Sequence, residues 1–389
     1  MSTHAAATRI EHDLLGDRDV PAEAYYGMHT LRARENFPIT GTPISIYPDL
    51  IKALAHIKHA AALANHELGL LDAPRKDAIV AAYAEIVAGR WHDQFVVDAI
   101  QGGAGTSTNM NANEVIANRA LELLGHAKGQ YQHLHPNEHV NIGQSTNDVY
   151  PTALKVATWY GIFSLVDAMV VMRRAFEAKA AEFADVLKMG RTQLQDAVPM
   201  TLGQGFSTYA TTLGEDEERT KEAALLIREV NLGGTAIGTA IGTGITAHPD
   251  YTALVCRHLG ALTGIPVITA PNLIEATQDC GAFVQLSGVF KRVAVKLLKT
   301  CNVLRLLSSG PRAGLGEINL PPRQAGSSIM PGKVNPVIPE VVNQIALEVI
   351  GNDVTVSFAA EAGQLQLNAF EPIIAHSLLR ASSTCATAA

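Results

Sequence analysis

Aromatic and charged residues are scarce in this chain of 389 residues. Aromatic residues make up 5% of the sequence and charged residues 17%, whereas apolar residues make up 47%, with heavy use of alanine. Strand-rich folds usually contain more aromatic and β-branched residues. The composition therefore favours long helices in close contact. A chain of this length should form two or three domains with an ample buried core.

The signals of nucleic-acid binding, secretion and membrane insertion are also missing. The formal net charge is -7, and no Lys/Arg-rich run with interleaved aromatic residues appears, so nucleic acid is not an expected partner. The start of the chain has no basic segment followed by an apolar one, and no uninterrupted apolar run reaches the ~18 residues that a membrane span needs. We expect a cytoplasmic protein that does not interact with membranes.

Cysteine is rare and is not arranged in pairs. Cys256, Cys280, Cys301 and Cys385 are scattered, without any C-x-x-C spacing. This pattern argues against a disulfide framework and against a cysteine zinc site. We expect four ordinary thiols, buried or free.

The pattern of apolar residues changes near residue 146. Residues 1–145 mix short elements with turn signals and Gly-rich loops such as 101–106, which predicts a loop-rich, mainly helical N-terminal domain. Residues 146–389 predict an all-α, elongated bundle of long helices that contains a conspicuous loop at 326–336.

Three long helices are predicted from apolar residues that recur at steps of three, four and seven. The first starts near Thr152, the second ends near Ser308, and the third starts around Pro339. The stripe of the first helix comprises Ile162, Leu165, Met169, Met172, Phe176 and Phe183, and that of the second comprises Phe283, Leu286, Phe290, Val293, Leu297, Cys301 and Leu304. One neighbour could cover such stripes only in part, so we expect a homo-oligomer.

Four segments concentrate hydroxyl, amide and glycine residues beyond what turns require. They are residues 105–113, 141–147, 190–193 and 326–336. Neutral donors beside flexible backbone can surround a carboxylate. Taken singly, each of the first two segments favours a helix N-cap, but together they shift the balance toward an anion site.

The 326–336 loop has the parts of a mobile lid. It carries two hydroxyls, Ser327 and Ser328, with glycines at 326 and 332, while Lys333 and Asn335 lie between two prolines. It is not a phosphate-binding P-loop, because five residues separate its two glycines and Val334 follows the lysine. A glycine-rich surface turn is the alternative interpretation.

Other motifs give weaker support to other chemistries. His133, His135 and His139 could suggest a metal site, but Pro136 breaks the helical spacing of metalloprotease ligands, so we predict no metal. The repeat at 234–244 does not match a dinucleotide-binding motif. No Gly-x-Ser-x-Gly elbow supports a hydrolase triad.

Taken together, the four segments resemble the signature regions of the fumarase and aspartase superfamily over nearly the whole chain. The 326–336 loop is similar to the most specific motif of that superfamily. Three stretches, 9–32, 143–148 and 363–372, resemble aspartases. Fumarases typically carry Gln-Thr in place of His29-Thr30, Ser-Ser-Asn in place of Ser145-Thr146-Asn147, and Lys in place of Glu371.

The resemblance implies a lyase that eliminates ammonia reversibly from L-aspartate to give fumarate. It also implies a helical-bundle homotetramer in which each active site takes residues from three subunits. No cofactor is expected, and activation by a divalent cation, as in some relatives, stays open. A class II fumarase acting on malate is one alternative. A structural or binding protein on a lyase scaffold, like the related lens crystallins, is the other.

The resemblance also assigns roles to individual residues. Ser327 matches the general base that removes the proton next to the β-carboxylate, and Arg32 matches an arginine thought to assist activity. Matches to the β-carboxylate site are Thr106, Ser145, Thr146 and Ser328, matches to the α-carboxylate site are Lys333 and Asn335, and matches near the amino group are Asn147 and Thr192.

Two features depart from the family pattern. Gln193 stands where fumarases and some aspartases have His, so an amide would contact the substrate there and a histidine general acid is excluded. The chain ends at Ala389, where family members continue into a small C-terminal domain. We expect that domain to be absent.

Overall fold

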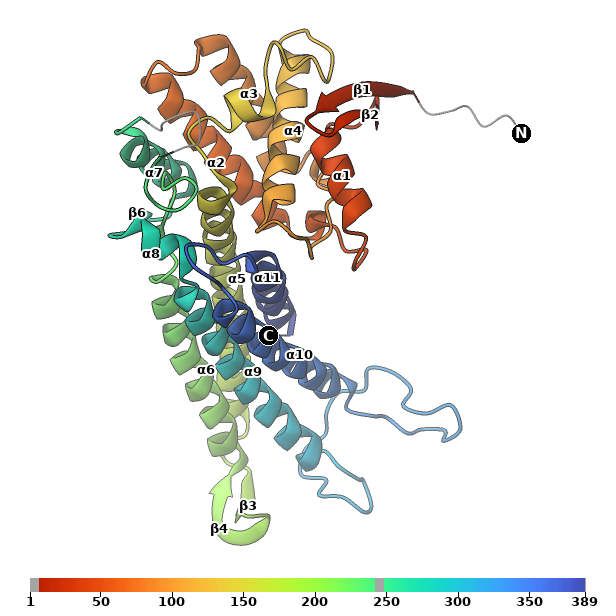
Figure 1. The fold of residues 1–389 in the computed structure, drawn as a ribbon. Coiled ribbons are helices and arrows are strands. Elements are labelled where there is room, and N and C mark those ends of the chain that lie inside the picture. The colour runs from red at the N-terminus through yellow and green to blue at the C-terminus, as the bar shows by residue number, and fades with distance from the viewer. Residues whose placement is uncertain (1–6, 242–247, 389) are drawn as a thin grey trace, which may run out of the picture. The chain divides into compact units, whose positions relative to one another are not determined.

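The computed structural model describes residues 7–241 and 248–388 and is mainly helical (Figure 1). Its contacts divide the chain into two compact units. Unit 1 comprises the described residues of 1–160, 225–283 and 357–379, and unit 2 comprises 161–224, 284–356 and the described residues of 380–389. Several long helices contribute residues to both units. The division expected at 145/146 from the sequence stays a prediction.

Unit 1 begins with an antiparallel hairpin and continues with four helices. The hairpin consists of β1 (Thr8–Asp13) and β2 (Gly16–Pro21). The helices are α1 (Met28–Asn36), α2 (Pro48–Glu67), α3 (Ala73–Val87) and α4 (Thr106–Leu123), with short turns η1 (Ile44–Ile46) and η2 (His92–Gln94) between them. Helix α2 packs against α3, α4 and α7 (Tyr251–Thr263), so its buried face lies at the centre of the unit.

The rest of unit 1 comes from later parts of the chain. A π-helical turn, η3 (Pro136–Val140), precedes α5 (Thr146–Glu182). The short parallel strands β5 (Glu229–Val230) and β6 (Ile268–Thr269) pair, and α8 (Leu273–Gln278) follows. Helix α11 (Glu371–Ala388) contributes its first half.

Local sequence explains where two of these helices start. Asp72 precedes α3, and its carboxylate accepts the N–H of Arg75. Asn272 precedes α8, and its side chain accepts the N–H groups of Ile274 and Glu275. Both are N-caps that satisfy otherwise unpaired N–H groups of the first turn.

Unit 2 is built from long helices joined by ion pairs. It contains the second part of α5, the hairpin of β3 (Leu187–Thr192) and β4 (Gln195–Thr201), α6 (Leu202–Ala224), most of α9 (Gly281–Leu307) and most of α10 (Val337–Glu361). Ion pairs join α5 to α6, α6 to α9 and α9 to α10, namely Arg173–Glu217 at 2.7 Å, Lys296–Asp216 at 2.8 Å and Lys291–Asp353 at 2.6 Å.

The predicted helical stripes are largely confirmed. In the first stripe the side chains of Ile162, Leu165 and Met169 are buried, and the later members are half-buried. The second stripe is buried from Phe283 to Cys301, and α9 ends at Leu307, one residue before the expected stop. The all-α class is confirmed, and the described part of the chain adds three short two-stranded sheets to it.

Helix α5 is the one described helix that is long and apolar enough, by length and composition, to cross a membrane. Half of its most apolar window is buried inside the protein. The core helix of a soluble protein meets the same criteria. The length and composition of α5 are therefore weak evidence for a membrane span.

Two histidines of α2 are buried against α3. The Nδ1 atom of His56 lies 3.0 Å from the hydroxyl of Tyr83, and the ring of His59 lies 4.2 Å from the Tyr83 ring, centroid to centroid. Burial lowers the pKa of both histidines from 6.5 to about 4, with smaller effects from nearby cations such as Lys52 at His56. Both side chains are therefore neutral in the folded protein near pH 7.

This burial predicts sensitivity to acid. The unfolded chain binds more protons than the folded chain between pH 6.5 and about 4, so each histidine should lower the free energy of unfolding by up to about 3 kcal/mol as pH falls through that range. We expect His56→Gln to reduce the fall in thermal midpoint between pH 7 and pH 5. His12→Gln, at a site whose side chain is 76% exposed, is the control, and an equal fall in all three proteins would contradict the prediction.

Candidate active site

The residues that the sequence assigns to an active site are divided between the two units. Unit 1 holds Arg32, Thr106, Ser145, Thr146 and Asn147, and unit 2 holds Thr192, Gln193, Ser327, Ser328, Lys333 and Asn335. Neither unit holds the whole set. The local geometry of each group is described in turn.

The start of α4 requires a glycine. Gly105 has a φ of 88°, and a Cβ atom built on it would lie 2.4 Å from the ring of Tyr150. Both the backbone conformation and the space therefore exclude other residues. This turn makes Thr106 the first residue of α4, half-buried, with its hydroxyl donating to the carbonyl of Gly103 at 2.7 Å. The N-cap residue, Gly105, has no side chain, and the N–H of Thr108 in the first turn donates to the side chain of Gln101 at 2.9 Å, so no hydroxyl or amide residue of 105–113 acts as the N-cap.

The start of α5 does have a side-chain cap. The Oγ atom of Ser145 accepts the N–H of Asn147 at 3.2 Å, and the carboxylate of Asp148 accepts the N–H of Ser145 at 2.9 Å. This is a reciprocal capping box, so the N-cap interpretation is correct for Ser145. Because Oγ acts as an acceptor, the hydroxyl hydrogen of Ser145 is left to donate elsewhere.

A buried lysine joins α2 to the 141–147 segment and α4. The Nζ atom of Lys58 donates to side-chain oxygens of Asn109 at 2.7 Å, Asn141 at 2.8 Å and Gln144 at 2.8 Å. Burial lowers the pKa of Lys58 to about 7, and the charge of Asp148 opposes this. Three acceptors match the three N–H donors of an ammonium group, so the geometry favours the charged lysine.

The same network reaches one of the predicted substrate-binding hydroxyls. The amide of Asn109 donates to the Oγ1 atom of Thr146 at 3.1 Å. Thr146 is therefore an acceptor within the protein, and its hydroxyl hydrogen, like that of Ser145, can donate to a ligand. Lys58 acts on Thr146 only through Asn109, and so it is a positioning residue.

Asp148 fixes the other side of the segment. Its buried carboxylate accepts the N–H groups of Gly233 at 3.1 Å and Thr235 at 2.9 Å. Burial raises the pKa of Asp148 to about 7, and the N–H donors oppose that effect. The side chain of Asn147 also donates to the carbonyl of Ala236 at 2.8 Å. Residues 231–236 thus hold the first turn of α5 in place.

Arg32 lies on α1 and is already paired. Its guanidinium donates through two nitrogens to the carboxylate of Asp13, both at 2.9 Å, and to the carbonyl of Gly16 at 3.0 Å. These contacts hold the β1–β2 hairpin against α1. Its predicted role in activity stays a prediction.

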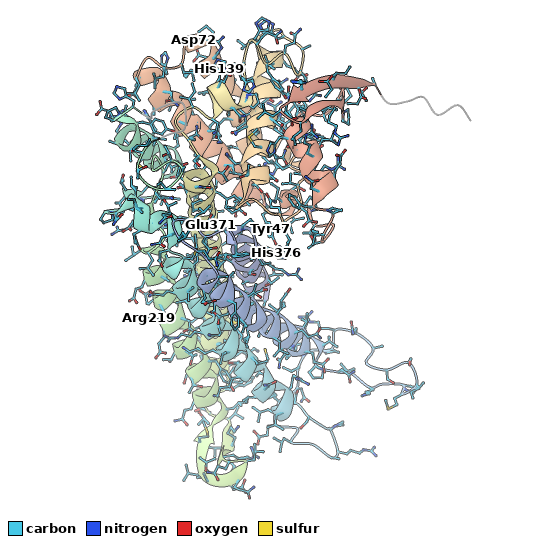
Figure 2. All side chains as sticks on the ribbon, viewed as in Figure 1. Tyr47, Asp72, His139, Arg219, Glu371 and His376 are labelled. Atoms are coloured by element: carbon cyan, nitrogen blue, oxygen red, sulfur yellow. The ribbon has the colours of Figure 1, made fainter. Side chains whose placement is uncertain are left out.

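Glu371 belongs to the 363–372 stretch that resembles aspartases, and it is buried at the start of α11. Only 3% of its surface is exposed, and burial raises its pKa to about 8, while the charge of buried Lys155 opposes that effect. Lys155 donates to the carbonyl of Glu229 at 2.7 Å. Figure 2 shows Glu371 near His376 on the same helix, where the Nδ1 atom of His376 lies 2.8 Å from the Tyr47 hydroxyl. Glu371 is an interior residue.

Thr192 and Gln193 lie at the tip of the β3–β4 hairpin in unit 2 (Figure 1). Gln193 and Leu194 have φ values of 52° and 62°, which is the left-handed conformation of a tight two-residue turn. The side chains of Thr192 and Gln193 are exposed. They are free of the packing that fixes Ser145 and Thr146.

The 326–336 loop is closed on itself. The N–H of Gly326 donates to the carbonyl of Lys333 at 2.8 Å, and the Asn335 side chain donates to the carbonyl of Gly326 at 2.8 Å. A Cβ atom on Gly326 would lie 2.7 Å from the backbone nitrogen of Asn335, so this close approach requires glycine. The two ends of the loop are therefore held together by one backbone hydrogen bond and one from the Asn335 side chain.

Ser327 is held inside this closed loop. Its Oγ atom accepts the N–H groups of Ile329 at 3.2 Å and Met330 at 3.0 Å, and its side chain is half-buried. Ser328 and Lys333 are exposed. Negative charge on the Ser327 oxygen would be met directly by two backbone donors.

The described residues contain no group of three or more His, Cys, Asp or Glu side chains placed to hold a metal ion. The histidines near residue 135 make other contacts. The Nδ1 atom of His135 accepts the N–H of Asn137 at 3.0 Å, and that of His139 accepts the N–H of His135 at 2.8 Å. The four cysteines are all buried free thiols. The 234–244 repeat lies partly outside the described residues.

Lys58, Asn109 and Asp148 were not assigned roles from the sequence. In residues 53–62 Lys58 and two histidines, His56 and His59, are the polar residues among alanine, leucine and isoleucine, and a lysine in such a stretch is the one signal that could have pointed to it. Its three partners are separated from it by 51 to 86 residues. Only the fold shows that these groups meet.

Comparisons with known proteins agree on one family. A protein-family model described as lyase matches residues 16–351. The chain is 62% identical over 370 residues to an aspartate ammonia-lyase of Helicobacter pylori strain J99, covering 95% of this chain and 78% of the relative. It is 57% identical over 371 residues to an aspartate ammonia-lyase of Escherichia coli K12, covering 95% and 77%.

Solved structures show the same fold. The crystal structure of a fumarate lyase:delta crystallin from Brucella melitensis bound to cobalt matches with a TM-score of 0.95 and 56% identity, covering 98% of this chain and 82% of that one. A class II fumarase from Schistosoma mansoni matches with a TM-score of 0.93 and 36% identity, covering 98% and 82%.

The contacts of Lys58 predict a large effect of its removal. Lys58→Met would leave three buried oxygens without their donor, which should cost about 3 kcal/mol or more of the free energy of unfolding. It should also weaken substrate binding, because Thr146 would lose its support through Asn109. Lys52→Met, on the same helix, breaks only a partly exposed pair with Asp49 at 3.8 Å and should change stability little. Equal thermal midpoints for the two variants would contradict the prediction.

Proposed function

The chain belongs to the lyase family whose model it matches, and on that premise we propose that it eliminates ammonia reversibly from L-aspartate to give fumarate. The observation that carries the proposal is the Ser327 loop. Its hydroxyl oxygen receives two N–H groups inside a closed turn, in a chain more than half identical to enzymes with this activity.

The proposed reaction needs only acid–base chemistry. Ser327, as its alkoxide, takes the proton from the carbon next to the β-carboxylate, and the electron pair moves into that carboxylate to form an aci-carboxylate with two negative charges. The pair then returns to form the carbon–carbon double bond while the neighbouring carbon–nitrogen bond breaks. Ammonia and fumarate leave, and no electrons are gained or lost, so no redox cofactor is required.

Serine is a weak base unless its alkoxide is stabilised. The N–H groups of Ile329 and Met330 point at the Ser327 oxygen, and such donors favour its charged form. We propose that closure of the loop brings the cation of Lys333 to the α-carboxylate of the substrate. Loop closure and base activation would then occur together.

The aci-carboxylate needs donors fixed before the reaction starts. The hydroxyls of Ser145 and Thr146 are both held as acceptors within the protein, so their hydrogens can point at a ligand. One such preorganised donor is typically worth about 10²–10³-fold in rate. We assign Thr106 and Ser328 to the same carboxylate, Asn335 to the α-carboxylate, and Asn147, Thr192 and Gln193 to the region around the amino group.

We further propose a homotetramer with each active site shared among three subunits. The support is the division of the predicted residues between two units and the large apolar side chains left exposed on the long helices. The latter are Phe163 and Val171 of α5, Val295 and Leu306 of α9, and Ile338, Val341, Leu347, Val354 and Phe358 of α10. Activation by a divalent cation and a cytoplasmic location stay predictions.

The general-base assignment is tested by Ser327→Ala. Removing the base should lower the turnover number for fumarate formation from L-aspartate by about 10²–10⁴-fold. Binding of L-aspartate, measured by calorimetry, should change little, because the donors that hold the carboxylates remain. Ser207→Ala, at an exposed hydroxyl of α6 that bonds only to a backbone carbonyl, is the matched control. Full turnover by the Ser327 variant would contradict the assignment.

The substrate is tested by assaying the wild-type protein with L-aspartate and L-malate side by side. We expect fumarate from L-aspartate and much less from L-malate. Activity on L-malate alone would make the protein a fumarase. Inertness toward both, with a folded protein, would favour the alternative of a non-enzymatic protein on a lyase scaffold.

A further inference from the structure

The connection between α9 and α10 falls into three parts that differ in hydrogen bonding. Residues 309–318 fold back on the end of α9, because the N–H of Gly316 donates to the carbonyl of Ser309 and that of Glu317 to the carbonyl of Leu307, both at 2.9 Å. Residues 326–336 form the closed loop described above. Between them, residues 319–325 take part in none of the hydrogen bonds made by the described residues, and they include two prolines.

This arrangement separates a fixed base from a movable loop. The base, 309–318, is attached to α9 and is joined to the closed loop only by the unbonded tether 319–325. At its other end the closed loop runs directly into α10, where the N–H of Val337 donates to the carbonyl of Asn335 at 2.9 Å. A segment with few hydrogen bonds opens at low free-energy cost. On the α9 side, therefore, only the tether limits movement of the closed loop, provided that the base stays in place.

Glu317, near the end of the base, is attached to a different element of unit 2. Its carboxylate forms ion pairs with Lys188, at 2.9 Å, and with Arg191. All three side chains are largely buried, with exposures of 18% for Glu317, 17% for Lys188 and 25% for Arg191. Burial acts to raise the pKa of Glu317, but the two cations outweigh it and lower the pKa below its usual range.

The two cations reach one carboxylate because β3 is irregular. Residues 188 and 191 are three apart, so a regular strand would point their side chains to opposite faces. The register of β3 against β4 shifts between Met189 and Arg191. At the shift, a Cβ atom on Gly190 would lie 2.9 Å from the carbonyl oxygen of Val198. The bulge turns Arg191 toward the same side as Lys188, as bulges do where a side chain must be re-aimed.

From this geometry we propose that Glu317 is a positioning residue that fixes the base of the Ser327 loop to the hairpin carrying Thr192 and Gln193. Arg191 directly precedes Thr192, so one ion-paired cluster holds both the hairpin tip and the point from which the tether starts. The loop then closes from a defined origin. The catalytic part of this inference rests on the proposed function.

The test uses Glu317→Gln, Lys188→Gln and the double variant in the full-length protein. Each single variant should lower the turnover number with L-aspartate by about 10-fold to 100-fold, as expected for small displacements of reacting groups. Because both changes break the same contact, the double variant should be no slower than the slower single variant. Losses that multiply would show that the two residues act separately and would overturn the proposal.

Hydrogen–deuterium exchange provides a readout that does not depend on activity. Backbone amides of 309–318 should exchange at least several-fold faster in Glu317→Gln than in the wild type. Exchange in α6 should stay unchanged. Glu182→Gln is the matched control, because it removes the same charge from an exposed pair with Lys179 in the same unit, and it should change neither exchange nor turnover.

The outcomes separate this inference from the proposed function. A wild-type protein inert toward L-aspartate would contradict the proposed function, while the exchange experiment would still decide whether Glu317 holds the base. Unchanged exchange at 309–318 in Glu317→Gln would overturn the inference whatever the activity. If Glu317→Gln does not fold, Lys188→Gln and Arg191→Gln apply the same exchange test from the hairpin side. Faster exchange at 309–318 would support the inference, and unchanged exchange would overturn it.

Discussion

The buried ammonium group of Lys58 is the interaction on which the unit 1 part of the site depends. Its three N–H donors join α2 to Asn109 of α4 and to two residues of the segment that leads into α5. A charge so deep in the protein is costly unless every donor finds an acceptor. The requirement for complete pairing therefore fixes three separate segments relative to one another, and Thr146 takes its place through Asn109.

The two units hold their predicted site residues in different ways. In unit 1, Ser145 and Thr146 are held from several sides by buried polar groups, so the hydroxyls that we assign to the carboxylate site are already fixed within the protein. In unit 2, the Ser327 loop is closed internally but joined to its base by an unbonded tether. A rigid set of donors and a movable Ser327 loop suit the proposed elimination, since the donors must be preorganised and the substrate must still enter and leave.

The long helices and the superfamily could be predicted from the sequence, because both depend on local patterns. Apolar residues at helical spacing and the stop expected near Ser308 predict α9 to within one residue of its end at Leu307, and the 326–336 motif is specific by itself. The N-cap alternative was correct for Ser145 and does not hold at Thr106, where the preceding residue is Gly105 and the side chain that caps the first turn is that of Gln101. Short strands such as β3 and β4 were not predicted, since a few residues in a hairpin carry little periodicity.

The sequence by itself determined the helical class, the lyase family and the Ser327 loop, because periodicity and a contiguous motif are properties of neighbouring residues. Only the tertiary structure decided that Lys58 meets Asn141 and Gln144, that Glu371 is an interior residue, and that Glu317 meets Lys188 and Arg191. These contacts join residues far apart in the chain, and in the last case they depend on a bulge that re-aims a side chain. Pairing of buried charges is settled by three-dimensional packing, which no local pattern records.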